Sequence, residues 1–170
     1  MISAGRWLIL FCAITASLQA ATMSLVSTNV QVGQNFLVSL IADTGNSALG
    51  GYLVEIIFSA DLLKLNAVNG GDAEFTAQPC CVNTNNPGRV RYVHQQAVSL
   101  TAPIGAIVVS QLAFTRIGAG NTNTTVSFLE ASLDNTDAQQ LSITSLVDAM
   151  IGTNETATIT NKILRVFTFE

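Results

Sequence analysis

The only histidine of the chain, His94, has the side chain best suited to proton transfer near neutral pH. Hydrolases need a nucleophile or a pair of carboxylates close to such a proton carrier, usually on loops that converge on a cleft. His94 instead falls inside a predicted strand, 89–99, on the same face as Val90 and Tyr92. We therefore predict a structural role for His94 and a protein that is not an enzyme.

Two groups of acidic residues could supply oxygen ligands for Ca²⁺. Asp61, Asp72 and Glu74 lie around two predicted turns, and residues 134–137 form the second group. Neither group has the spacing of an EF-hand loop. Because Asp and Asn are also common turn formers, the sequence favours turns at both places, and we predict no metal ion and no cofactor.

The adjacent residues Cys80 and Cys81 cannot join distant parts of the chain. They could form a strained vicinal disulfide, remain two free thiols, or link to another chain. A zinc site needs about four ligands, and no cluster of His or Cys surrounds the pair. The sequence leaves the state of the thiols open, and the simplest interpretation is a loop without chemistry.

The first 20 residues are typical of a secretory signal peptide, with a lone amphipathic anchor as the alternative. Arg6 precedes the apolar run 7–14, and small and polar residues follow. This run is shorter than the roughly 20 residues that cross a bilayer. We place the signal peptide at residues 1–20 and predict a secreted protein, with no membrane span in the mature chain and one domain at 23–170.

Charge is sparse, and the formal net charge is −4 at pH 7. The sequence has no run of like charges that could bind nucleic acid or an anionic membrane surface electrostatically, so we predict neither as a partner. Thr, Ser, Asn, Val, Ala and Gly are frequent, which favours short strands and polar turns over helices.

Short alternating segments dominate the rest of the sequence, and Gly, Asn, Asp and Pro separate nearly all of them. We predict an all-β fold, a jelly-roll β-sandwich of about nine strands with few or no helices. The last predicted strand either closes the sandwich or ends as an unpaired tail. The predicted strands are residues 24–27, 35–42, 51–59, 64–68, 89–99, 106–115, 124–130, 142–147 and 157–167.

The predicted strand 51–59 carries apolar side chains on both of its faces. Alternation assigns Val54 and Ile56 to the core, and places Leu53 and Ile57 on the other face. That second face is either covered by the chain's own loops or last strand, or offered to a partner.

An aromatic platform for sugar rings is poorly supported. Sugar-binding sandwiches usually stack sugar rings on exposed Trp or Tyr. The single Trp lies in the predicted signal peptide, and Tyr52 and Tyr92 fall on predicted core faces. A polysaccharide partner would therefore be held by hydrogen bonds from Asn, Gln and Asp alone.

Residues 25–147 resemble the cohesin module of bacterial cellulosomal scaffold proteins in the order and spacing of short motifs. These motifs are Val30-x-Val32-Gly33-x-x-Phe36-x-Val38, Leu49-Gly50-Gly51-Tyr52, Phe58-Ser59-Ala60-Asp61-Leu62-Leu63, Gly88-Arg89-Val90-Arg91, Leu112-Ala113-Phe114 before Gly118, and Ala131-Ser132-Leu133-Asp134.

The resemblance implies a nine-stranded jelly roll that binds a Ca²⁺-loaded helical partner, dockerin, through one face of a sheet. In this sequence that face is expected to have an apolar centre and a polar rim. Gly51 and Leu53 stand where the best-known members place polar residues, which favours a more apolar contact. The expected partner-binding residues are Gly51, Leu53, Glu55, Ile57, Arg91, Val93 and Gln95.

Three functions follow from these observations. The first is a secreted, non-catalytic interaction module that binds a dockerin-like or other protein partner in a polysaccharide-degrading or cell-surface assembly. The second is a carbohydrate-binding module of related sandwich fold. The third is a structural extracellular domain, joined to its assembly through the C-terminal segment or the Cys80–Cys81 pair.

Overall fold

Ten β-strands and one short 3-10 helix make up the part of the chain that the computed structural model describes, residues 20–28, 30–96, 102–118, 122–152 and 160–162. The predicted signal peptide lies outside the described residues, except for Ala20. The elements are β1 (Ala20–Ser27), β2 (Asn35–Asp43), β3 (Leu49–Phe58), β4 (Leu63–Gly70), η1 (Ala73–Phe75), β5 (Cys80–Asn83), β6 (Arg89–Gln95), β7 (Ala106–Arg116), β8 (Thr124–Asn135), β9 (Gln140–Ile151) and β10 (Thr160–Lys162).

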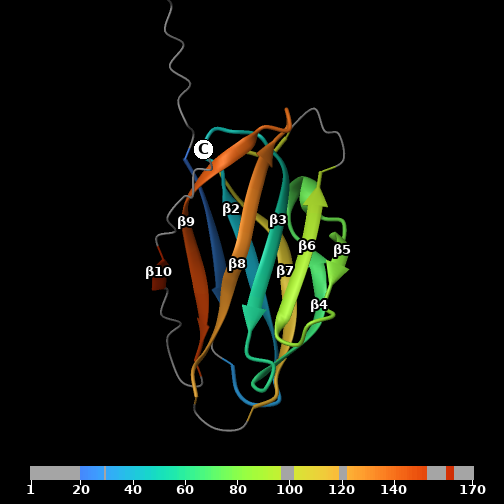
Figure 1. The fold of residues 1–170 in the computed structure, drawn as a ribbon, viewed down its shortest axis with the longest axis vertical. Helices are drawn as coiled ribbons and strands as arrows, with labels where there is room; N and C mark the ends of the chain where they lie inside the picture. Colours follow the sequence, from blue (N-terminus) through green and yellow to red (C-terminus); the bar gives the residue numbers. More distant parts are fainter. Residues whose placement is uncertain (1–19, 29, 97–101, 119–121, 153–159, 163–170) are drawn as a thin grey trace, which may run out of the picture.

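The strands form two sheets that share β9. One sheet has the order β4-β7-β2-β1-β9, and the other has the order β9-β8-β3-β6-β5. β9 runs parallel to β1 and antiparallel to β8, so it joins the two layers along one side, whereas β4 and β5 are edge strands. In Figure 1 the layer of β8, β3 and β6 lies in front of β2 and β7. The prediction of an all-β jelly-roll sandwich is confirmed.

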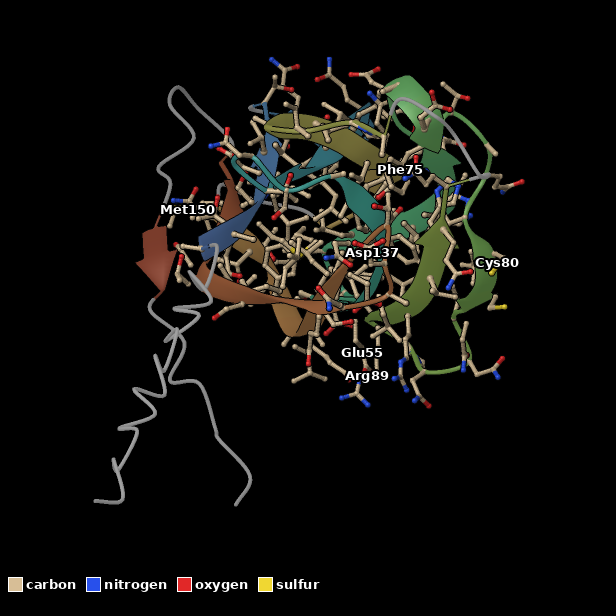
Figure 2. All side chains as sticks on the ribbon, turned by 90° about the horizontal axis from the view of Figure 1, so that it is seen from above. Glu55, Phe75, Cys80, Arg89, Asp137 and Met150 are labelled. Carbon is tan, nitrogen blue, oxygen red and sulfur yellow. The ribbon has the colours of Figure 1, made fainter. Side chains whose placement is uncertain are left out.

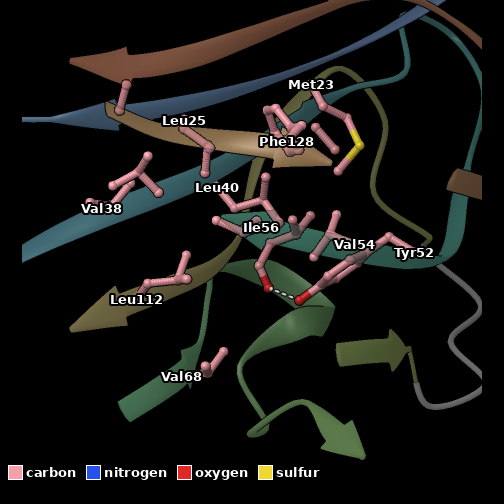
Figure 3. Packing of buried hydrophobic residues seen from close by; sticks show 14 of the residues in the cluster. Met23, Leu25, Val38, Leu40, Tyr52, Val54, Ile56, Val68, Leu112 and Phe128 are labelled. Carbon is pink, nitrogen blue, oxygen red and sulfur yellow. Dashed lines mark hydrogen bonds between the residues drawn. The ribbon is translucent and has the colours of Figure 1, made fainter. Parts of the chain in front are cut away.

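Alternation of apolar side chains creates the core between the two layers. β2 contributes Val38 and Leu40, and β3 contributes Val54 and Ile56, all fully buried. Figure 3 shows these side chains pointing toward one another from opposite sheets. The core face predicted for strand 51–59 is therefore confirmed at Val54 and Ile56.

Two buried tyrosines have their hydroxyl groups paired inside the core. Tyr52 Oη donates to the backbone carbonyl of Val109 over 3.1 Å (Figure 3), and Tyr92 Oη lies 2.9 Å from Ser110 Oγ. Burial raises the pKa of both phenols well above the ordinary value. These rings act as neutral core residues, as the sequence predicts.

Several predicted boundaries differ from the structure. β1 begins at Ala20, ahead of the predicted strand and of residue 23, and Ala21 is already buried in the core. β8 and β9 extend beyond their predicted segments. The sequence missed β5 and η1. Of the predicted last strand, the structure describes β10, and the rest lies outside the described residues.

Candidate functional site

Six of the seven partner-binding residues that the sequence predicts have side chains on the outer side of the β8-β3-β6-β5 layer. β3 pairs with both β6 and β8 in antiparallel register. Leu53 therefore faces Val93 on one neighbouring strand and Ser132 on the other. We use the name front face for the outward side chains of β3 and β6, which are Leu53, Glu55, Ile57, Arg91, Val93 and Gln95.

The front face has apolar side chains at its centre. Leu53 and Val93 are half-buried and directly opposite each other, and Ile57 is exposed. Leu129 adds a further exposed apolar side chain from β8, where 47% of its surface is accessible. This combination is unusual for a sheet face turned only toward water, because antiparallel sheets normally place polar residues there.

Leu129 is a candidate contact residue that sequence reasoning missed. The register between β3 and β8 shifts after Glu55, because Glu55 pairs with Glu130 and the next residue, Ile56, pairs with Phe128. Leu129 is the extra residue of this bulge. Alternation from the buried residues Val126 and Phe128 places Leu129 on the outer side, so the sequence contained the signal for this residue. The bulge, which also leaves Glu130 exposed, is not visible in simple alternation.

Two ion pairs border the apolar centre. Arg89 Nε lies 2.9 Å from Glu55 Oε1, and Arg91 Nη2 lies 3.2 Å from Glu130 Oε2. Figure 2 shows Glu55 and Arg89 projecting together from the outer side of the sandwich. Arg91 and Glu130 are both exposed, and pairs of this kind contribute little to stability, about 0–1 kcal/mol. At the rim of a protein interface, charges mainly set orientation and specificity.

Gly51 differs from the other predicted contact residues because it is buried. It lies in register with Gln95, and a Cβ at this position would come within 3.1 Å of Gln95 Cγ and 3.2 Å of the His94 carbonyl oxygen. The absence of a side chain lets β3 and β6 approach closely at this end. Gly51 thus offers no side-chain surface to a partner, in contrast to the prediction.

The described part of the C-terminal segment does not cover the front face. β10 pairs with β9, over Leu146 to Asp148, at the far side of the β8-β3-β6-β5 layer. Figure 1 shows β10 outside β9, away from β3 and β6. Among the described residues, the front face is therefore open.

The acidic groups do not form a metal site in the described part of the chain. Nowhere in that part do three or more His, Cys, Asp or Glu side chains gather in a way that could hold a metal ion. Asn135 Oδ1 accepts hydrogen bonds from the backbone N–H groups of Asp137 and Gln139, at 2.9 and 2.8 Å. The interpretation of residues 134–137 as a turn is confirmed.

His94 is a buried aromatic neighbour rather than part of a catalytic group. Only 6% of its surface is accessible, and its ring meets Phe75 and Tyr52 edge-on, with centroids 5.2 and 5.9 Å away. Its Nδ1 atom is buried and finds no hydrogen-bond partner among the described residues. Because burial disfavours the charged imidazolium, it lowers the pKa of His94.

We expect the protein to lose stability through His94 as the medium becomes acidic. The unfolded chain takes up a proton on this ring near the ordinary pKa of about 6.5, whereas the folded chain does so only at lower pH. The free energy of unfolding should therefore fall as the pH decreases below about 6.5. Urea unfolding followed by circular dichroism at several pH values measures this slope.

His94→Phe is the matched control, because Phe fits aromatic neighbours and does not titrate. The carboxylates titrate in both proteins, so the difference between the two pH profiles isolates the histidine. Parallel profiles between about pH 7 and 5 would contradict the assignment.

No helix among the described residues is both long enough and apolar enough to cross a membrane.

Comparisons with known proteins show which fold this arrangement represents. No family model matches the chain, and no curated protein sequence matches it. Solved structures do match. The sixth cohesin of scaffoldin B from Acetivibrio cellulolyticus, solved in complex with a dockerin, is 11% identical with a TM-score of 0.69, and the match covers 79% of this chain and 99% of that chain.

Two further solved structures give the same result. A type I cohesin–dockerin complex from Clostridium thermocellum is 11% identical with a TM-score of 0.67, covering 78% of this chain and 98% of that chain. A non-cellulosomal cohesin from the archaeon Archaeoglobus fulgidus is 9% identical with a TM-score of 0.64, covering 78% and 90%. At such identities the likeness concerns the fold. The chain has the fold of a cohesin module.

Proposed function

We propose that the chain is a secreted, non-catalytic interaction module of the cohesin type that binds a dockerin-like protein through its front face. The observation that carries this proposal is the open outer side of β3 and β6, with apolar side chains at its centre and charged side chains around them. The similarity to cohesins solved with dockerins supports it.

The arrangement of the front face suits a protein partner. Leu53, Val93 and Ile57 form the apolar centre, which excludes water when a partner helix lies on it. Arg91 and Gln95 are exposed at the rim, where they select and orient the partner. Leu129 extends the apolar area toward β8.

A protein fits this site better than a polysaccharide. In the described residues, the large apolar side chains with high exposure are aliphatic and include no aromatic ring. Tyr52 and Tyr92 are 1% exposed and point into the core. A sugar ring therefore finds no flat aromatic surface on the front face.

Secretion is part of the proposal and follows from the predicted signal peptide at residues 1–20. An extracellular location places the module where scaffold proteins and polysaccharide-degrading enzymes act. The location can be checked separately by N-terminal sequencing of the protein from culture medium.

A direct binding experiment tests the function. The purified chain is immobilised and exposed to dockerin modules from the same organism, with Ca²⁺ and with a chelator. We expect saturable binding of at least one dockerin that is lost with the chelator, because dockerins fold around Ca²⁺ in the family that the chain resembles. Failure of every dockerin to bind, combined with retention of the chain on insoluble polysaccharide, would overturn the proposal.

A further inference from the structure

Cys80 and Cys81 lie on β5, the edge strand of the β8-β3-β6-β5 layer. Both cysteines are free and exposed. Their sulfur atoms are 3.2 Å apart. Adjacent side chains of a regular strand point to opposite faces, which would keep the two thiols separate. Figure 2 shows β5 at the outer edge of the molecule, with Cys80 at the surface.

The backbone of β5 explains why the sulfur atoms meet. Cys81 has a φ of 58°, in the left-handed region that residues other than Gly seldom adopt. The register with β6 is broken between Cys80, opposite Val93, and Asn83, opposite Arg91. This irregularity turns the Cys81 side chain toward Cys80. Strained conformations of this kind are usually found where the local geometry has a function.

We propose that Cys80 and Cys81 form a reversible redox site, in which the two thiols close to a vicinal disulfide by exchange with a small-molecule disulfide. The site lies next to the front face, because Cys80 is opposite Val93 in the register, but the exchange reaction itself needs no protein partner. It acts in the folded protein on the accessible edge of β5.

The reaction balances in two exchange steps. In the first, one cysteine loses its proton to solvent and its thiolate attacks the external disulfide R–S–S–R. A mixed disulfide forms, and R–S⁻ leaves and takes up a proton. In the second step, the other cysteine loses its proton and attacks the protein sulfur of the mixed disulfide. The Cys80–Cys81 bond forms and a second R–SH is released, so two electrons pass from the two thiols to the external disulfide.

Either thiol can make the first attack, because both are exposed. The other thiol then resolves the mixed disulfide, since the two sulfur atoms are only 3.2 Å apart.

The short distance between the Cα atoms of Cys80 and Cys81 makes a disulfide between them easy to reduce. Cα atoms of adjacent residues are about 3.8 Å apart, whereas disulfides usually join Cα atoms about 4.4–6.8 Å apart. A bond formed within that shorter span is strained and therefore more readily reduced. The pair is thus suited to switching rather than to permanent cross-linking.

Peptide mapping of the full chain tests the proposal. The reduced protein is treated with oxidised glutathione, quenched in acid, alkylated without reduction and cleaved with trypsin. Cleavage after Lys64 and Arg89 isolates residues 65–89, which contain only these two cysteines. We expect this peptide to be lighter than its reduced form by two hydrogen atoms and to carry no alkyl group. A phosphine reductant should restore two alkylation sites.

Single variants show whether each thiol resolves the mixed disulfide formed on the other. Cys80→Ser and Cys81→Ser should each stop at a mixed disulfide with one glutathione, because the resolving thiol is missing. Because both side chains are exposed, we expect the variants to fold, and their circular dichroism checks this. A wild-type peptide that stays reduced, keeps glutathione, or is linked to a second copy of the chain would overturn the proposal.

Discussion

Replacing Phe114 by Ala is expected to lower the free energy of unfolding by about 3–5 kcal/mol. Phe114 is fully buried on β7, between the strands β2 and β4 that pair with it. Its ring stacks on Phe36 with centroids 5.7 Å apart and meets Phe58 edge-on at 5.0 Å. The substitution removes both contacts and leaves a cavity that fixed strands on either side cannot close.

This loss is a large share of the stability of a single domain, which is commonly about 5–15 kcal/mol. Urea unfolding followed by circular dichroism measures it. Leu37→Ala is the control, because Leu37 is the next residue after Phe36 on the same strand but is 45% exposed on the outer side of β2. We expect that change to stay within about 0.5 kcal/mol. Equal losses for the two variants would contradict the packing described around Phe114.

The strands with one buried face are those that the sequence predicts best. In β2, every second residue from Phe36 to Ala42 is apolar because it must enter the core, so the period of two is visible in the sequence. The same pattern assigned Val54 and Ile56 to the core and Leu53 to the opposite face, as the structure has them. A strand that is buried on one side therefore shows an alternation of apolar residues that can be recognised in the sequence.

The elements that the sequence did not predict lack this alternation of apolar residues. All four residues of β5 are exposed, so nothing in their order marks an inner and an outer face. Backbone hydrogen bonds to β6 hold this strand, and any residue except Pro can make them. The meeting of the two sulfur atoms depends on the positive φ of Cys81, which the sequence does not reveal.

The candidate site, too, was predicted only in part from the sequence. Alternation alone placed the side chains of the front face, but it did not give their ionic partners. Glu55 is opposite Arg91 in the register, yet it pairs with Arg89, while Arg91 reaches Glu130. Arg89 is a diagonal neighbour of Glu55, whereas Arg91 reaches across β3 to β8. The choice of partner therefore depends on the reach and direction of long side chains on a twisted sheet rather than on sequence spacing.

Leu53→Asp is expected to weaken binding of a dockerin-like partner by about 30-fold or more, equivalent to at least 2 kcal/mol. Leu53 lies at the centre of the front face beside Val93, where a partner would remove both side chains from water. A carboxylate there would have to lose its hydration without gaining a cation. Val93→Asp should act in the same way. Isothermal titration calorimetry measures the change in Kd.

Leu37→Asp is the matched control, since it places the same charge at an exposed leucine on the opposite sheet. We expect Leu37→Asp to leave the Kd unchanged and all three variants to unfold within a few degrees of the wild type, because none of the side chains belongs to the buried core. Loss of binding in the control as well would place the contact elsewhere. A large drop in the unfolding temperature for Leu53→Asp alone would mean that Leu53 stabilises the sandwich instead of contacting a partner. A new charge destabilises folding strongly only where the side chain is already removed from water in the free protein.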